Sequence, residues 1–199
     1  MAAATREAKR LLRREMKQRL AALSTIEKTR QSDFIFKKLT SHPVYQHSQR
    51  VSVYLSTPDE VNTEGILKDL FASNKKCFVP QYIGAQMEML RLNSMEDYDT
   101  LPLTKWNIKQ PAEGDKREEA LATAGGLDLI IVPGLGFTTG GDRLGKGKGY
   151  YDKYQERCAK HQSGKPKTIA LAFKEQICPH VPVSDADVTI DHVIYGDME

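Results

Sequence analysis

The sequence is poor in the residue types that mark several common protein classes. It has three cysteines and one tryptophan in 199 residues, and no apolar run approaches the ~20 residues that a membrane-spanning helix needs. Cys77, Cys158 and Cys178 form no CxxC pair, and none of the five histidines lies at zinc-ligand spacing from them. We therefore expect no disulfide framework, zinc site or membrane span, and sparse cysteines indicate a reducing compartment.

An excess of charge of one sign is also missing. The chain carries 29 Lys and Arg against 26 Asp and Glu, and a net charge of +3 is too small to indicate a nucleic-acid partner. The cations concentrate in residues 5–22, where leucines and Met16 recur at helical spacing and predict an amphipathic helix. The same segment is faintly like a transit peptide, but Glu7 and Glu15 oppose that interpretation, so we expect a cytoplasmic protein.

Helices and strands alternate along the rest of the chain. Ser24 and Glu27 form a capping box that predicts a second helix, which His42-Pro43 would end. Further helices are expected at 63–72 and 149–162, and strands at 51–55, 76–80, 87–92, 128–133, 168–173 and 188–195, with residues 93–125 irregular. This order favours an α/β sheet with helices on its faces, and the length fits a single domain over residues 1–199.

The densest chemical signal is the segment 133–154. Seven glycines fall between Gly134 and Gly149, directly after a buried strand and before a helix. Such a loop lets backbone N–H groups approach a phosphate, and the helix N-terminus adds partial positive charge. Arg143, Lys146 and Lys148 would supply mobile cations for the same anion. A flexible surface loop with solvated lysines is the alternative.

Two standard phosphate fingerprints do not fit this loop. Gly140, Gly145 and Lys146 have P-loop spacing, but Gly147 follows where a Ser or Thr hydroxyl would bind magnesium. The glycines at 145, 147 and 149 have the wrong third spacing for a dinucleotide motif.

The loop and several other segments together carry a resemblance to a known family. RLGKGKGYYDKY, preceded by DLIIVPGLGF, resembles the signature of the 5-formyltetrahydrofolate cyclo-ligases, also called methenyltetrahydrofolate synthetases, and is closest to the animal enzymes. The matching segments elsewhere are KRLLRREMK, YLSTPDEVNTEGI, WNIKQP, ALAFKEQI and VPVSDADVTID, so that the resemblance runs from about residue 8 to residue 195.

The resemblance implies a fold and an activity. The fold would be a Rossmann-like three-layer α/β sandwich with a mostly parallel central sheet and a basic N-terminal helix. The activity would be the closure of 5-formyltetrahydrofolate to 5,10-methenyltetrahydrofolate, a carbon–nitrogen ligation that uses ATP and Mg²⁺ and releases ADP and phosphate through a phosphorylated formyl intermediate. The partners would be these small molecules, without nucleic acid or membrane, and the enzyme would be a monomer.

The resemblance also implies roles for individual residues. Lys148, Tyr150 and Arg143 would be catalytic, and Asp152 and Asp187 would bind the metal. The ATP-binding set would be Lys9, Arg10, Arg13, Arg143, Leu144, Gly145, Lys146, Gly147, Lys148, Gly149, Tyr150 and Tyr151. The folate-binding set would be Arg13, Leu55, Glu60, Trp106, Lys146, Gly147, Lys148, Gly149 and Tyr150.

Each assignment has a plainer alternative. The cations of the first helix fit a solvated basic face, Trp106 and the Tyr150-Tyr151 pair fit a core, and Asp152 fits a first-turn carboxylate that favours the helix dipole. For the whole chain, the alternatives are a nucleic-acid-binding module and a folate or nucleotide binder without turnover. The first helix has no aromatic residue, which argues against nucleic-acid binding. Lys148, Asp152 and Glu60 are all present, which argues against a binder without turnover.

Overall fold

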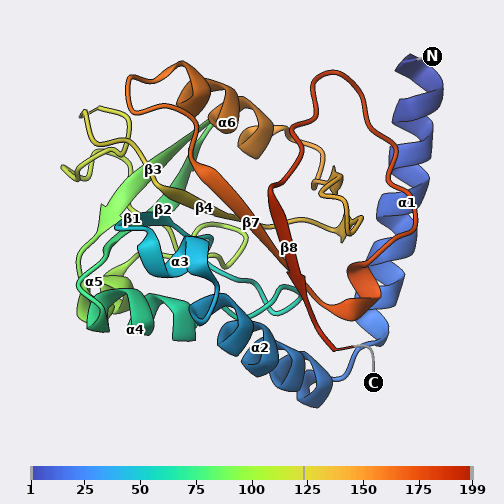
Figure 1. Ribbon diagram of the computed structural model, residues 1–199, viewed down its shortest axis with the longest axis horizontal. Coiled ribbons are helices and arrows are strands. Elements are labelled where there is room, and N and C mark those ends of the chain that lie inside the picture. The colour runs from blue at the N-terminus through green and yellow to red at the C-terminus, as the bar shows by residue number, and fades with distance from the viewer. Residues whose placement is uncertain (1, 123, 198–199) are drawn as a thin grey trace.

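The computed structural model describes residues 2–122 and 124–197 and is an α/β fold around a six-stranded sheet (Figure 1). The helices are α1 (Ala2–Ala22), α2 (Thr25–Thr40), α3 (Pro43–His47), α4 (Glu64–Ala72), α5 (Met95–Thr100) and α6 (Tyr150–Lys160), with a 3-10 turn η1 (Lys174–Gln176). The central strands are β1 (Arg50–Ser52), β2 (Lys76–Ile83), β3 (Gln86–Leu92), β4 (Leu129–Val132), β7 (Lys167–Ala172) and β8 (His192–Tyr195). A separate two-stranded hairpin consists of β5 (Gly136–Phe137) and β6 (Arg143–Leu144).

The strand order places a change of direction in the middle of the sheet. The order is β3-β2-β1-β4-β7-β8, and every neighbouring pair is parallel except β2 and β3. Val51 of β1 lies in register between Cys77 and Leu129. The chain leaves β1 towards one edge and returns to start β4 on the other side, so β1 and β4 form the switch point where α/β sheets usually bind ligands.

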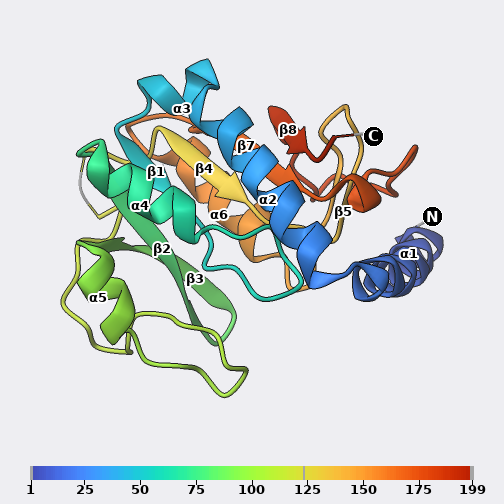
Figure 2. The same ribbon diagram turned by 90° about the horizontal axis from the view of Figure 1, so that it is seen from below.

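Two apolar layers sandwich the sheet, which confirms the predicted three-layer arrangement. Ile131 of β4 packs with α2 and α4 residues on one face, whereas Ile130 packs with α6 residues on the other. This alternation follows from the two-residue period of a strand. Figure 2 shows α2, α3 and α4 on one side of the sheet and α6 behind it. Cys77, Cys158 and Cys178 are buried free thiols within these layers.

Capping side chains mark the starts of α2, α3 and α5, and the last two of these helices were not predicted from the sequence. The Ser24 hydroxyl accepts a hydrogen bond from the Glu27 N–H, as the capping box predicts. His42 does not simply end α2, because its ring nitrogen accepts the Val44 N–H and starts α3. The stretch 93–125 is not wholly irregular either, since Ser94 caps the short helix α5.

Helix α1 is attached to the sheet through η1, against which it packs (Figure 1). Its inner side is formed by Met16 and Leu20, which are buried. Leu11, which we expected in the same apolar stripe, is 42% exposed, whereas its neighbour Leu12 packs against the core. None of the described helices is long and apolar enough to cross a membrane.

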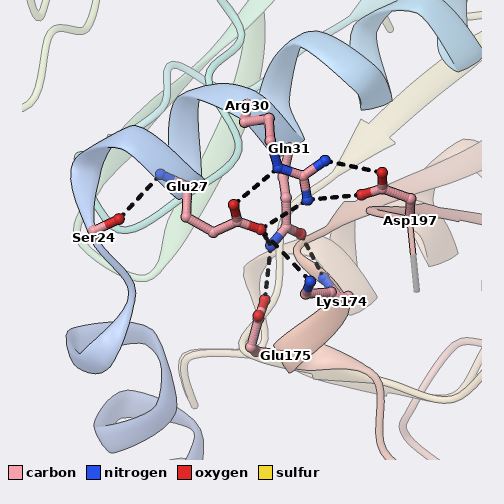
Figure 3. Close-up of polar contacts among 7 residues, drawn as sticks. All are labelled: Ser24, Glu27, Arg30, Gln31, Lys174, Glu175 and Asp197. Atoms are coloured by element: carbon pink, nitrogen blue, oxygen red, sulfur yellow. Dashed lines mark hydrogen bonds and ion pairs between the residues drawn. The ribbon is translucent and has the colours of Figure 1, made fainter. Parts of the chain in front are cut away.

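A polar network fixes η1 in turn (Figure 3). The buried Gln31 side chain of α2 donates to Glu175 and accepts the Lys174 N–H, while Arg30 forms a two-bond ion pair with Asp197. The network therefore joins α2 and η1 to the segment that follows β8, and α1 packs against the η1 turn that it holds.

Candidate active site

A cavity of about 870 Å³ opens at the carboxyl ends of β1 and β4, the switch point of the sheet. Leu55 and Glu60 reach it from the segment after β1, and Pro133 and Gly134 from the segment after β4. The glycine-rich loop, the N-terminal half of α1, the 104–110 loop and residues 184–187 complete its walls. Segments from both ends of the chain thus converge where the topology favours a ligand.

The glycine-rich segment is an ordered loop, here called the cradle, and not a shapeless surface loop. The β5–β6 hairpin leads directly into Gly145–Gly149 and then α6, with Gly147 and Gly149 at φ of 103° and 69°, which side chains disfavour. Gly149 is the N-cap of α6 and offers no side-chain cap. Gly149 therefore provides no side-chain acceptor for the first N–H groups of α6, a setting that favours phosphate.

Lys146 and Lys148 are the exposed cations of this cradle. Lys146 Nζ lies 2.6 Å from Glu60 Oε1, across the cavity from its own loop. Lys148 makes no ion pair with any residue in the described part of the chain, so its ammonium is available to a ligand.

Arg143 corrects our expectation of a third mobile cation. Its side chain is buried, donates to the Pro133 carbonyl and pairs with Asp152 at 2.8 Å. The guanidinium also lies over the Tyr151 ring, with its carbon 5.8 Å from the centroid. Arg143 sits on β6 and lines the cavity as Lys146 and Lys148 do, but its bonds to Pro133 and Asp152 tie it to the segment after β4 and to α6.

Helix α1 brings two of its three predicted cations to the cavity. Lys9 pairs with Asp187 at 2.5 Å, and the Arg13 Nε donates to the Gly145 carbonyl at 2.9 Å. Their four-residue spacing puts both on one helical face, as expected. Arg10 lies on another face, pairs with Glu7 and is not among the cavity-lining residues.

The two predicted metal carboxylates both line the cavity, and the segments that carry them are in contact. Asp152 Oδ1 accepts the N–H of Val188, the residue directly after Asp187, at 3.2 Å. Asp187 Oδ2 accepts bonds from Lys9 and Ser184. Burial raises the Asp187 pKa, but the bonds from Lys9 and Ser184 outweigh it and hold that pKa below its ordinary value. The nearby Asp191 is not a cavity residue, because its carboxylate accepts hydrogen bonds from the N–H and the hydroxyl of Thr168 in β7.

The carboxylates of Asp152 and Asp187 fit one kind of magnesium site. The described residues contain no cluster of three or more acidic, His or Cys side chains that could enclose a metal. Mg²⁺ is commonly held by one or two carboxylates together with substrate phosphates and water. Asp152 and Asp187, beside a phosphate cradle, suit that shared arrangement and not an all-protein cage.

The opposite wall of the cavity is apolar and aromatic. The Tyr82 and Tyr150 rings pack with centroids 5.0 Å apart, and the Tyr150 hydroxyl donates to the Gly84 carbonyl at 2.7 Å. Tyr151 is buried and packs in the core, but it also lines the cavity, so both tyrosines of the pair belong to the cavity wall. Trp106 is 70% exposed at the rim, which rules out the core alternative for it.

Several lining residues were missing from the predicted set. They are Arg6, Tyr54, Thr57, Pro80, Tyr82, Thr104, Ile108, Lys109, Gln110, Pro133, Gly134, Lys153, Glu156, Ser184 and Ala186. Thr57, Ile108 and Gln110 lie inside segments that resemble the family, which was the available signal. Tyr82 had none, because only folding brings β2 beside α6.

The comparisons with known proteins decide the family. The family model described as the 5-formyltetrahydrofolate cyclo-ligase family matches residues 5–196. The chain belongs to this family. It is 56% identical to the 5-formyltetrahydrofolate cyclo-ligase of Mus musculus, covering 99% of this chain and 98% of the relative.

Cyclo-ligases of other organisms extend the match. The Arabidopsis thaliana relative, named as mitochondrial, is 32% identical over 94% of this chain and 73% of its own length. The NMR structure of Aquifex aeolicus 5,10-methenyltetrahydrofolate synthetase superposes with a TM-score of 0.76 at 27% identity, covering 94% of this chain and 89% of that one. The predicted resemblance and fold class are confirmed, and the protein is an enzyme of the cyclo-ligase family.

Proposed function

We propose that the protein converts 5-formyltetrahydrofolate to 5,10-methenyltetrahydrofolate, consuming ATP with Mg²⁺ and releasing ADP and phosphate. One observation carries the proposal: a single cavity joins a helix N-terminus without a side-chain cap, and Lys148, which has no ion pair among the described residues, to an aromatic wall and the largely buried Glu60 carboxylate. The first half suits a triphosphate, and the second suits a flat pterin with N–H donors.

The chemical problem is the leaving group. A formamide oxygen departs poorly, so transfer of the γ-phosphoryl group to it would give an iminium phosphate with an electrophilic carbon. The neighbouring folate nitrogen then attacks this carbon, loses its proton, and the carbon–oxygen bond breaks with phosphate as the leaving group. Phosphoryl transfer needs positioning and charge neutralisation more than a covalent protein group.

The side chains divide this work between them. Lys148 would neutralise charge on the transferring phosphoryl group, with Lys9, Arg13 and Lys146 on the remaining phosphates. Tyr150 lies where the two substrates would meet, and Arg143 acts by holding the cradle and Asp152 in place. Magnesium, when bound by Asp152 and Asp187, would supply further charge neutralisation on the phosphates.

The folate would lie along the other wall. Leu55 supplies apolar surface, Glu60 would accept hydrogen bonds from pterin N–H groups, and Trp106 at the rim would stack on the ring. A single domain, a monomeric state and a cytoplasmic location stay predictions from the sequence.

The reaction can be followed by its product. The conjugated methenyl group absorbs in the near ultraviolet, so we expect absorbance to rise when the protein, 5-formyltetrahydrofolate, ATP and Mg²⁺ are mixed. Leaving out any one of the four should abolish the rise. Binding of both substrates without product would show a binder that lacks turnover.

We expect Glu60→Gln to raise the KM for the folate roughly tenfold while the KM for ATP, measured at saturating folate, changes little, because a charge-assisted acceptor for the folate is lost. Steady-state kinetics with each substrate varied in turn measures this. Asp59→Asn is the matched control, because the Asp59 side chain is 71% exposed and pairs with Lys28 outside the cavity. An equal rise in both KM values would contradict the assignment.

A further inference from the structure

One ion pair spans the two halves of the cavity. Lys146 belongs to the phosphate cradle and Glu60 to the segment after β1, and their charged atoms lie 2.6 Å apart. Glu60 is a predicted folate ligand, and Lys146 is predicted to contact both the nucleotide and the folate. While this pair is formed, neither group is free for its proposed ligand.

The two partners are held very differently. Glu60 Oε2 accepts the N–H and the hydroxyl of Thr57, and the Glu60 N–H donates to the Thr57 carbonyl. Only 10% of the Glu60 side chain is exposed, against 53% for Lys146. Lys146 has no second polar partner within the described ranges, and it lies between Gly145 and Gly147. Lys146 is therefore the partner that can leave.

We infer that Lys146 masks Glu60 until a nucleotide draws the lysine away, so that the nucleotide and the folate bind with positive coupling. The inference rests on the function proposed above. A triphosphate at the N-terminus of α6 carries more negative charge than one carboxylate and lies beside the Lys146 backbone. When Lys146 turns to it, Glu60 Oε1 loses its bond in a largely buried place and becomes an acceptor for a pterin donor.

The coupling follows because the Lys146–Glu60 ion pair has to be broken only once. Either ligand alone must separate Lys146 from Glu60, whereas the second ligand to bind finds them already apart. The effect must be the same in both directions, because linkage makes it reciprocal. We expect the folate Kd to fall about five-fold when the nucleotide is bound, the low end of couplings between sites.

Calorimetric titration of the whole protein with 5-formyltetrahydrofolate tests this, with and without Mg²⁺ and the non-hydrolysable analogue adenylyl imidodiphosphate. For Lys146→Gln we expect the folate Kd without nucleotide to be equal to or lower than the wild-type value. The ratio of its folate Kd without nucleotide to that with nucleotide should be near one. Lys148→Gln is the matched control: it removes the same charge two residues away from a lysine without an ion pair in the described chain. It should keep the wild-type ratio even if its affinities fall.

Three results would overturn the inference. The first is a wild-type ratio of one, and the second is a Lys146→Gln ratio that equals the wild-type value. The third is weaker folate binding by Lys146→Gln without nucleotide, which would mean that Lys146 holds the folate directly. Any of these with product still formed in the absorbance assay removes the masking role alone, whereas no product and no folate binding by the wild type removes the proposed function as well.

Discussion

Lys148→Ala is expected to lower the turnover number about 10²–10³-fold, the usual loss when one preorganised donor to a transition state is removed. The side chain is exposed on the cradle next to the α6 N-terminus and makes no ion pair with the described residues. Its charge matters most when the phosphoryl group is in transit. The Kd of the folate, measured by calorimetric titration, should therefore change far less than the turnover number.

The appropriate control is Lys160→Ala, which removes a lysine from the last turn of the same helix, outside the cavity. Its turnover should stay close to the wild-type value. A Lys148→Ala variant whose folate affinity and turnover fell by the same factor would place Lys148 in ground-state binding of the folate.

The sequence predicted the main elements of the fold because each has a strong local signal. The apolar run of β4 and the alternation of β3 identify strands, and the Ser24 cap marks the start of α2. The two missed helices, α3 and α5, are only five and six residues long. Such short helices show too few turns for a period to be visible, so only their caps reveal them.

The residue types of the site could be predicted from the sequence, but the ion pairs between those residues could not. Glycine spacing and family resemblance pointed to Lys146 and Glu60, yet nothing local indicates that these residues, 86 positions apart, form an ion pair. Arg143 looked like its neighbouring lysines in the sequence. Its burial arises from the β5–β6 hairpin, which turns it towards Asp152 and away from solvent. Tertiary contacts of this kind decide whether a cation binds a substrate or holds the protein together.

Asp152→Asn is expected to have two effects, because Asp152 is both a partner of Arg143 and a proposed metal ligand. The Arg143 side chain is 6% exposed, so loss of the carboxylate leaves a buried cation without its counter-charge. Breaking such a pair from one side lowers the free energy of unfolding by about 3 kcal/mol or more. Urea unfolding should show this as a lower midpoint at an unchanged slope.

Asp187→Asn separates the two effects. Its partner Lys9 stands at the cavity edge, and both side chains are more exposed than Arg143, at 13% and 21%. The loss of stability should therefore be smaller, about 1 kcal/mol or less. Both variants should need more Mg²⁺ for half-maximal product formation if both carboxylates serve the metal. An Asp152→Asn enzyme that is destabilised but has an unchanged magnesium titration would leave Asp152 with the structural role alone, and Asp187 would then be the single protein ligand.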